Sequence, residues 1–144
     1  MTSKSFVDSN IWLYALLEEK VELSKKEKVK TFLERLKTES HIIVSVQVLN
    51  EFHWVLKRKY QIEEARIRQR VLNDILELSD VVSLDLQTYK DAWRILDKYD
   101  IAYWDSIIVA SALNSHCEIL YSEDMQHDLE IENKLVIKNP LLLQ

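Results

Sequence analysis

The sequence of 144 residues contains no glycine, one cysteine and one proline. Without glycine, the chain cannot form the glycine-rich loops that cradle phosphates, which excludes Walker A loops and dinucleotide-binding turns. Backbone positions with a positive φ must instead be filled by asparagine, aspartate or histidine, the residues that best tolerate this conformation. The candidates for these positions are Asn114, His116, Asp128, Asn133 and Asn139.

The single cysteine, Cys117, excludes an internal disulfide framework and fits a reducing compartment, so we expect a cytoplasmic protein. No stretch of the sequence reaches the apolar length of a membrane span, so no membrane association is expected. The length suits one compact core, and no linker composition or internal repeat divides the chain. We therefore predict a single domain over residues 1–144.

Basic residues are in the minority, with 19 lysines and arginines against 24 aspartates and glutamates, a net charge of -5. A protein that binds nucleic acid passively relies on neutralising many phosphates, so this class is disfavoured. A nuclease stays compatible, because an enzyme needs only a local basic path beside its site. A cluster of metal-binding carboxylates would also contribute to an acidic excess.

Short apolar runs alternate with amphipathic helical patterns along the whole chain. Strands are predicted at 6–7, 41–44, 81–84, 119–121 and 135–137. Helices are predicted at about 11–16, 24–36, 46–60, 63–79, 89–99 and 104–113, with a break around 18–23. Such alternation is typical of an α/β fold, here a three-layer α/β/α sandwich whose central, mostly parallel sheet has four or five strands.

Two acids follow predicted strands. Asp8 ends the first strand, and Asp124 lies just beyond the strand at 119–121. Ligands of open parallel sheets bind outside the carboxyl ends of the strands, so both carboxylates would face one crevice if these strands are neighbours. An aspartate in this place is also a frequent helix N-cap, and that alternative for Asp8 stays open.

Two more acids lie on apolar faces of predicted helices. Glu51 is at the edge of the apolar stripe of the third helix, and Asp105 falls inside the apolar stripe of the last. A buried, unpaired charge is costly, so Asp105 must be capped, paired or bound to a cation. Its place in the first helical turn also allows stabilisation by the helix dipole alone.

Carboxylates that converge raise one another's pKa unless a cation offsets their charge. Mg²⁺ and Mn²⁺ are the natural candidates, because these hard ions prefer carboxylate and water ligands. An ion of this kind can activate a bound water and stabilise a phosphoryl oxygen. A site with acids only, and no histidine or cysteine ligand, indicates phosphodiester hydrolysis.

Four segments together resemble the signature segments of the PIN domain family, and most of all its VapC-type toxin ribonucleases from toxin–antitoxin systems. They are residues 6–12 (Phe-Val-Asp-Ser-Asn-Ile-Trp), 48–52 (Val-Leu-Asn-Glu-Phe), 103–112 (Tyr-Trp-Asp-Ser-Ile-Ile-Val-Ala-Ser-Ala) and 119–125 (Ile-Leu-Tyr-Ser-Glu-Asp-Met). Their order and spacing also match, and the likeness covers nearly the whole chain.

This resemblance implies an Mg²⁺- or Mn²⁺-dependent endoribonuclease with the PIN fold, an RNA substrate, a homodimer, and a cognate antitoxin that inserts into the active-site groove. Asn10 would help to hold the first aspartate, and Ser122 would order the last acid or a water. The matching catalytic, metal-binding acids are Asp8, Glu51, Asp105 and Asp124.

Three positions near these segments carry expectations of their own. His116 stands where relatives often have glycine, and we expect it to adopt the left-handed conformation. Asp128 would add a fifth acid close to the site. Lys57, less than two turns beyond Glu51, would contact a phosphate of the substrate.

Other features have simpler interpretations. The basic cluster at Lys25, Lys26, Lys28 and Lys30 is expected on the solvated side of a helix. Trp12 and Trp104 are expected in the core, although either could stack on a base or meet a partner.

Four other functions remain as alternatives. The first is a free-standing PIN-domain RNA-processing nuclease, and the second is a non-catalytic RNA-binding scaffold. An aspartyl-phosphate phosphatase would need a second aspartate where the chain has Asn10. A receiver domain would need paired acids at the first strand, which supplies only Asp8.

Overall fold

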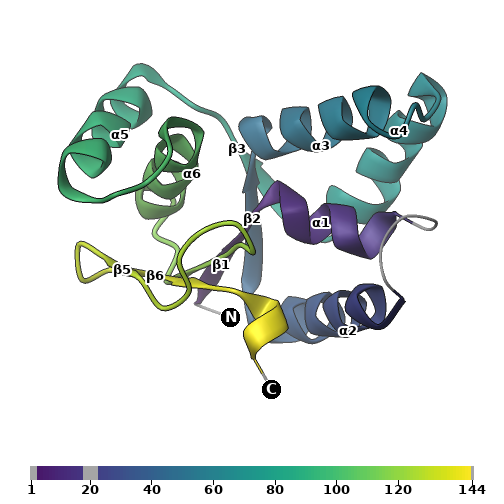
Figure 1. Ribbon diagram of the computed structural model, residues 1–144, viewed down its shortest axis with the longest axis horizontal. Helices are drawn as coiled ribbons and strands as arrows, with labels where there is room; N and C mark the ends of the chain where they lie inside the picture. Colours follow the sequence, from purple (N-terminus) through teal and green to yellow (C-terminus); the bar gives the residue numbers. More distant parts are fainter. Residues whose placement is uncertain (1–2, 18–22, 144) are drawn as a thin grey trace.

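A computed structural model describes residues 3–17 and 23–143 of the chain. Six strands form one sheet in the order β3-β2-β1-β4-β6-β5. Figure 1 shows how the strands and helices are arranged. Every neighbouring pair is parallel except β5 and β6. The strands are β1 (Lys4–Val7), β2 (His41–Ser45), β3 (Ser79–Val82), β4 (Ile119–Tyr121), β5 (Glu130–Ile131) and β6 (Leu135–Lys138).

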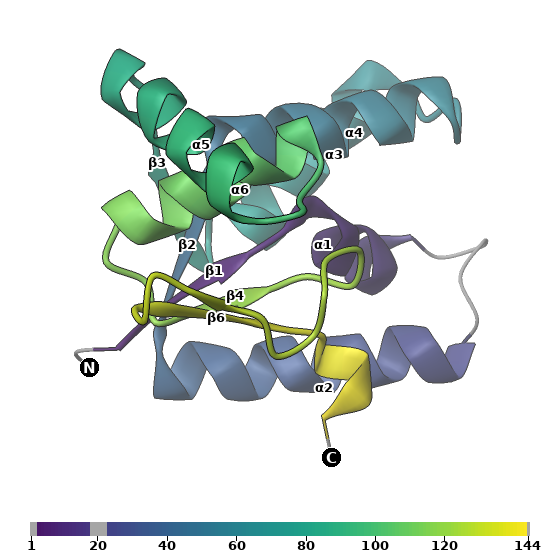
Figure 2. The same cartoon turned by 60° about the vertical axis from the view of Figure 1, so that its left-hand side comes forward.

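Helices cover both faces of this sheet, as Figure 2 shows: α2 lies against one face, and α6 with α5 behind it lies against the other. In the parts of the chain that are described, no helix is both long enough and apolar enough to cross a membrane. The helices are α1 (Ser9–Leu16), α2 (Leu23–Glu39), α3 (Val46–Arg58), α4 (Glu64–Arg70), α5 (Leu86–Lys98) and α6 (Tyr103–Asn114), with a π-helical turn η1 (Val71–Ile75) and a 3₁₀ turn η2 (Pro140–Leu142).

The predicted α/β fold with a mostly parallel sheet is confirmed. The sheet has six strands rather than four or five, because β5 has only two residues and leaves no periodic pattern in the sequence. The strand predicted at 81–84 lies at Ser79–Val82. The helix predicted to reach residue 79 ends at Ile75, whose carbonyl accepts a hydrogen bond from the Ser79 hydroxyl (2.7 Å). Most of the break expected around 18–23 lies outside the described residues.

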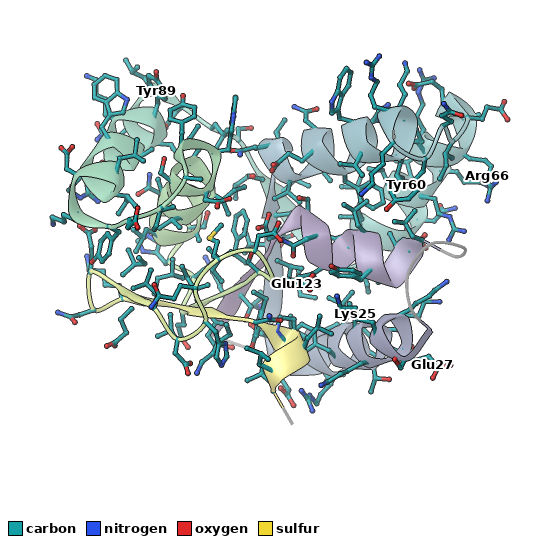
Figure 3. The ribbon with its side chains drawn as sticks, viewed as in Figure 1. Lys25, Glu27, Tyr60, Arg66, Tyr89 and Glu123 are labelled. Atoms are coloured by element: carbon teal, nitrogen blue, oxygen red, sulfur yellow. The ribbon has the colours of Figure 1, made fainter. Side chains whose placement is uncertain are left out.

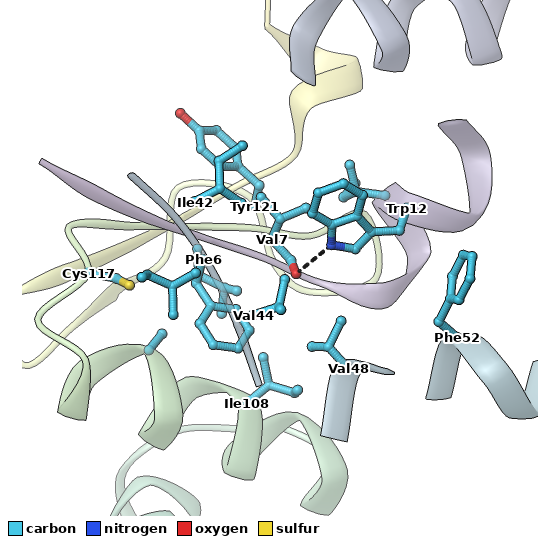
Figure 4. Close-up of a cluster of buried hydrophobic side chains, with 14 of the residues drawn as sticks. Phe6, Val7, Trp12, Ile42, Val44, Val48, Phe52, Ile108, Cys117 and Tyr121 are labelled. Carbon is cyan, nitrogen blue, oxygen red and sulfur yellow. Dashed lines mark hydrogen bonds between the residues drawn. The ribbon is translucent and has the colours of Figure 1, made fainter. Parts of the chain in front are cut away.

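Buried side chains from the central strands and the flanking helices form the core, shown in Figure 4. Phe6 of β1 is fully buried and lies on the side of α6, which contributes Ile108. On the side of α2, the rings of Phe32 and Tyr121 meet edge to face with centroids 4.6 Å apart. Trp12 is buried as predicted, and its indole N–H donates to the Val7 carbonyl (3.3 Å), which satisfies a polar group inside the core.

Three of the five predicted positive-φ positions are confirmed: His116 (62°), Asp128 (69°) and Asn133 (55°). The predictions for Asn114, which is helical, and Asn139, with a φ of -95°, were wrong. Glu132 has a positive φ that residue type did not suggest. Tertiary contacts hold it there, since Tyr99 accepts from its N–H and Arg94 pairs with its carboxylate.

Candidate functional site

Strands β1 and β4 bring the first and last predicted acids to the same edge of the sheet. Val7 pairs with Tyr121, so the residues that follow these strands emerge side by side. Asp8 is only 5% exposed, and its two oxygens accept from the Ser9 N–H (2.8 Å) and from the Ser122 hydroxyl (2.9 Å). With one oxygen it is therefore the N-cap of α1, as the alternative interpretation proposed, and the other oxygen faces the crevice.

Burial raises the pKa of Asp8 to about 6. Hydrogen bonds from Ser122 and Ser9 act in the opposite direction, and the nearby charges of Asp105 and Asp124 raise the pKa further. The raised pKa means that the charged form of Asp8 is disfavoured in the folded protein. A cation bound next to Asp8 would offset this cost.

The side chain of Asn10 lies between the first and last acids. Its Nδ2 donates to Asp124 Oδ2 (3.0 Å) and lies 3.5 Å from Asp8 Oδ2 and 3.4 Å from the Ser122 hydroxyl. Its Oδ1 accepts from the Glu123 N–H (3.2 Å). Asn10 thus fixes the loop after β4 to the start of α1 without adding a negative charge to the crevice.

Helices α3 and α6 supply the other two acids. Burial raises the pKa of Glu51 to about 7, and the charges of Asp8 and Asp105 add to the effect. Burial and the charge of Asp124 raise the pKa of Asp105. Asp105 and Asp124 raise the pKa of Asp8, and Asp8, Asp105 and Asp124 all raise the pKa of Glu51, so the four predicted carboxylates lie near one another. Their role as ligands stays a prediction.

As the side chains are placed, no group of three or more aspartates, glutamates, histidines or cysteines in the described ranges could hold a metal ion. The residues nevertheless suit a hard divalent cation, because all the converging donors are carboxylate oxygens. Glu51 Oε1 is buried and has no hydrogen-bond partner among the described residues, while the Gln47 side chain one helical turn earlier lies close enough to the carboxyl group to lower its pKa. An oxygen in that state favours a ligand that the protein itself does not provide.

The sequence pattern of the PIN domain matches residues 5–129. The chain belongs to the PIN domain family. No curated protein matches the chain. The similar solved structures include VapC20 of Mycobacterium tuberculosis, a toxin that cleaves the sarcin-ricin loop, at 16% identity and a TM-score of 0.66, covering 83% of this chain and 91% of that one.

Two complexes also share this fold. A toxin–antitoxin complex from Klebsiella pneumoniae has 20% identity and a TM-score of 0.66, covering 94% of this chain and 97% of that one. VapBC2 from Rickettsia felis, bound to a promoter DNA fragment, has 17% identity and a TM-score of 0.65, covering 94% and 98%. At these identities the structural likeness shows a common fold.

Two further residues that were expected near the site of this PIN domain, Asp128 and Lys57, have their contacts elsewhere. Asp128 pairs with Lys138 and His127, and the hydrogen bond from Lys138 lowers its pKa. Lys57 pairs with Glu64 at 2.8 Å. The structure therefore brings neither side chain into contact with the four acids.

Gln47 was not singled out from the sequence, yet it connects two of the helices that carry acids. It is 8% exposed, and its Nε2 donates to the Trp104 carbonyl at 3.1 Å. This bond fixes the residue before Asp105 to the helix turn before Glu51. The only signal in the sequence was its spacing, four residues before Glu51.

Lys25 is half-buried, which corrects the prediction of a solvated basic cluster, whereas Lys28 is exposed as predicted. Lys25 pairs with Glu123 at 2.9 Å, and Lys28 donates to the Leu141 carbonyl at 2.7 Å. Neither contact could be predicted, because each partner lies about 100 residues away in the sequence and becomes a neighbour only in the folded chain.

An open groove of about 1010 Å³ lies beside Glu51, between α3, α6 and the connection from β3 to α5. Trp54 and Trp104 line it and are 60% and 65% exposed. The prediction that Trp104 packs in the core was wrong, because at the start of α6 its side chain points outward. The groove is mostly apolar, and Glu51 is the one of the four acids that lines it.

Proposed function

We propose that this PIN domain is a metal-dependent endoribonuclease that hydrolyses RNA phosphodiester bonds, and that it is the toxin of a type II toxin–antitoxin pair. The observation that carries the proposal is the proximity of Asp8, Glu51, Asp105 and Asp124, with raised pKa values for the first three. Family membership and the toxin fold of the similar structures support it.

The four acids would hold Mg²⁺, with Mn²⁺ as the alternative ion. When bound, such an ion lowers the pKa of a water and stabilises negative charge on a phosphate. The Ser122 hydroxyl and the Asn10 amide orient Asp8 and Asp124 by donating to one oxygen of each. Glu51, whose Oε1 has no hydrogen-bond partner among the described residues, would be the acid placed to accept the proton of an attacking water.

A cognate antitoxin is the proposed partner. Similar folds occur in a toxin–antitoxin complex from Klebsiella pneumoniae and in VapBC2 from Rickettsia felis. The groove beside Glu51 is apolar and has two exposed tryptophans on its walls. Such a surface is typical of one that a protein segment covers. An antitoxin segment in this groove would lie next to the acids and block access to them.

A homodimer is also proposed, formed through the outer face of α5. Leu86, Tyr89 and Trp93 are exposed there, and the rings of Tyr89 and Trp93 meet edge to face at 5.1 Å. Figure 3 shows Tyr89 on the outside of the molecule. Exposed aromatic and aliphatic side chains gathered on one face are typical of a surface covered by another chain.

Cleavage of RNA by the purified protein tests this function. Wild-type protein should cleave single-stranded RNA with Mg²⁺ or Mn²⁺ and stop when the ions are chelated. Asp8→Asn and Asp105→Asn should each lower the rate by about 100-fold or more, because a ligand charge is lost. Asparagine still caps a helix, so Asp8→Asn should leave α1 intact.

The matched control is Asp97→Asn, an exposed position on α5, which should cleave like wild type. Equal cleavage by wild type and both active-site variants would overturn the assignment of the acids. Tight RNA binding without any metal-dependent cleavage would instead support the RNA-binding scaffold.

A further inference from the structure

Asp124 lies in the loop after β4, three residues beyond the end of the strand. Backbone hydrogen bonds to β6 hold this loop on either side of Asp124, from the Ser122 N–H to the Lys138 carbonyl (2.9 Å) and from the Asp128 N–H to the Ile137 carbonyl (2.7 Å). At the start of α1, the neutral side chain of Asn10 contacts both the Glu123 N–H and the Asp124 carboxylate, and the N-cap Asp8 accepts from the Ser122 hydroxyl (2.9 Å).

A charged contact reaches the same loop from α2. Lys25 Nζ lies 2.9 Å from Glu123 Oε1, and Figure 3 shows both side chains where α2 faces the loop. The same ammonium lies 3.4 Å from the Tyr14 hydroxyl and 4.5 Å from the centre of its ring. Lys25 therefore joins α1, α2 and the residue directly before Asp124.

This ion pair is partly shielded from water. The side chains of Lys25 and Glu123 are 34% and 20% exposed, and Glu123 Oε2 is buried with no hydrogen-bond partner in the described part of the chain. A charge-assisted bond in such a place is stronger than a neutral one. Without the ammonium, Glu123 would place an uncompensated negative charge next to Asp124.

We propose that Lys25 and Glu123 form a positioning pair that holds the loop after β4 against α1 and α2 and so orients Asp124 in the metal site. Neither side chain contacts the reacting atoms in this arrangement. The inference rests on the proposed function, since it holds only if Asp124 is a ligand of the proposed metal site. It predicts that breaking the pair displaces Asp124 while the core of the fold stays intact.

The test compares Lys25→Met, Glu123→Gln and the double variant with wild type. Each single variant should lower kcat by about tenfold with little change in KM, because a charge-assisted contact is lost at a distance from the substrate. The double variant should be no worse than either single one, since the two residues act as a unit. Lys25→Arg keeps the charge and the donor, so it should retain most of the activity.

Binding of Mn²⁺ to the RNA-free protein supplies a readout besides activity. Titration by electron paramagnetic resonance should show binding weakened several-fold in Lys25→Met and Glu123→Gln, and restored in Lys25→Arg. The matched control is Lys30→Met, an exposed position on the same helix, which should bind Mn²⁺ and cleave like wild type. Thermal unfolding checks that each variant is folded. If Lys25→Met does not fold, Glu123→Gln alone tests the inference.

The outcomes separate this inference from the proposed function. If wild type cleaves RNA and binds Mn²⁺ but both variants match Lys30→Met, the positioning pair is refuted and the nuclease stands. A raised KM with an unchanged kcat would also overturn the inference, because Lys25 would then contact the RNA. If wild-type protein neither binds Mn²⁺ nor cleaves RNA, the proposed function itself fails.

Discussion

At the residue scale, the folded protein holds two carboxylates where ionisation is unfavourable. The pKa values of Asp8 and Glu51 are raised to about 6 and about 7, against ordinary values of 3.8 and 4.5. The folded state therefore binds more protons than the unfolded state between about pH 4 and pH 7. The contribution of these groups to stability is greatest below that window and is lost as the pH rises through it.

Glu51→Gln should remove part of this pH dependence. In the presence of a chelator, the variant should gain stability relative to wild type as the pH rises from 5 to 8, by roughly 1–3 kcal/mol. Urea unfolding at several pH values measures this difference. Glu118→Gln, at an exposed position, is the control and should follow wild type at every pH. A constant difference between Glu51→Gln and wild type across the pH range would contradict the account.

The four acids could be predicted from the sequence because each lies inside a short recognisable segment. Their charged and polar neighbours could not. Lys25 gave the same signal as any lysine on an amphipathic helix, and Trp104 looked like part of an apolar run. What distinguishes both residues is the element packed beside them, which depends on the folded chain.

At the scale of elements, Gln47 connects α3 and α6 at the point where each presents an acid. Gln47→Ala should lower the free energy of unfolding by about 1 kcal/mol, because one buried hydrogen bond is lost. The amides in the first turn of α6 should also exchange faster with solvent, and RNA cleavage should slow. Hydrogen exchange followed by mass spectrometry measures the exchange rate of the amides in this turn.

Gln69→Ala is the matched control, at an exposed position on α4. It should leave exchange in α6 unchanged. Equal exchange in α6 for Gln47→Ala and wild type would show that the bond to Trp104 does not hold the helix in place.

The same scale explains which elements the sequence could predict. Helices α1 to α5 carry apolar periodicity, α6 is a nearly continuous apolar run, and β1, β2, β4 and β6 are short apolar runs, so all of these were anticipated. Strand β3 begins two residues earlier than its apolar run because parallel pairing with β2 starts at Ile42 and Ser79. Strand β5 exists only as a partner of β6, and no local pattern marks it.

At the scale of the whole molecule, the exposed face of α5 determines the proposed assembly. Trp93→Ser should weaken the dimer by at least about tenfold, because exposed tryptophans in an interface carry much of its binding energy. Light scattering over a range of protein concentrations measures this shift. Leu72→Ser, which is also exposed but lies on η1, should leave the assembly unchanged. A monomeric wild type at high concentration would contradict the homodimer.

The central claim is that the four carboxylates form one metal-binding site, and a crystal grown with Mn²⁺ tests it most directly. Anomalous scattering should show an ion about 2 Å from carboxylate oxygens of Asp8 and Asp105. Asp124 and Glu51 should contact the same ion directly or through water. A well-ordered crystal in which no anomalous peak lies within reach of Asp8 and Asp105 would contradict the account.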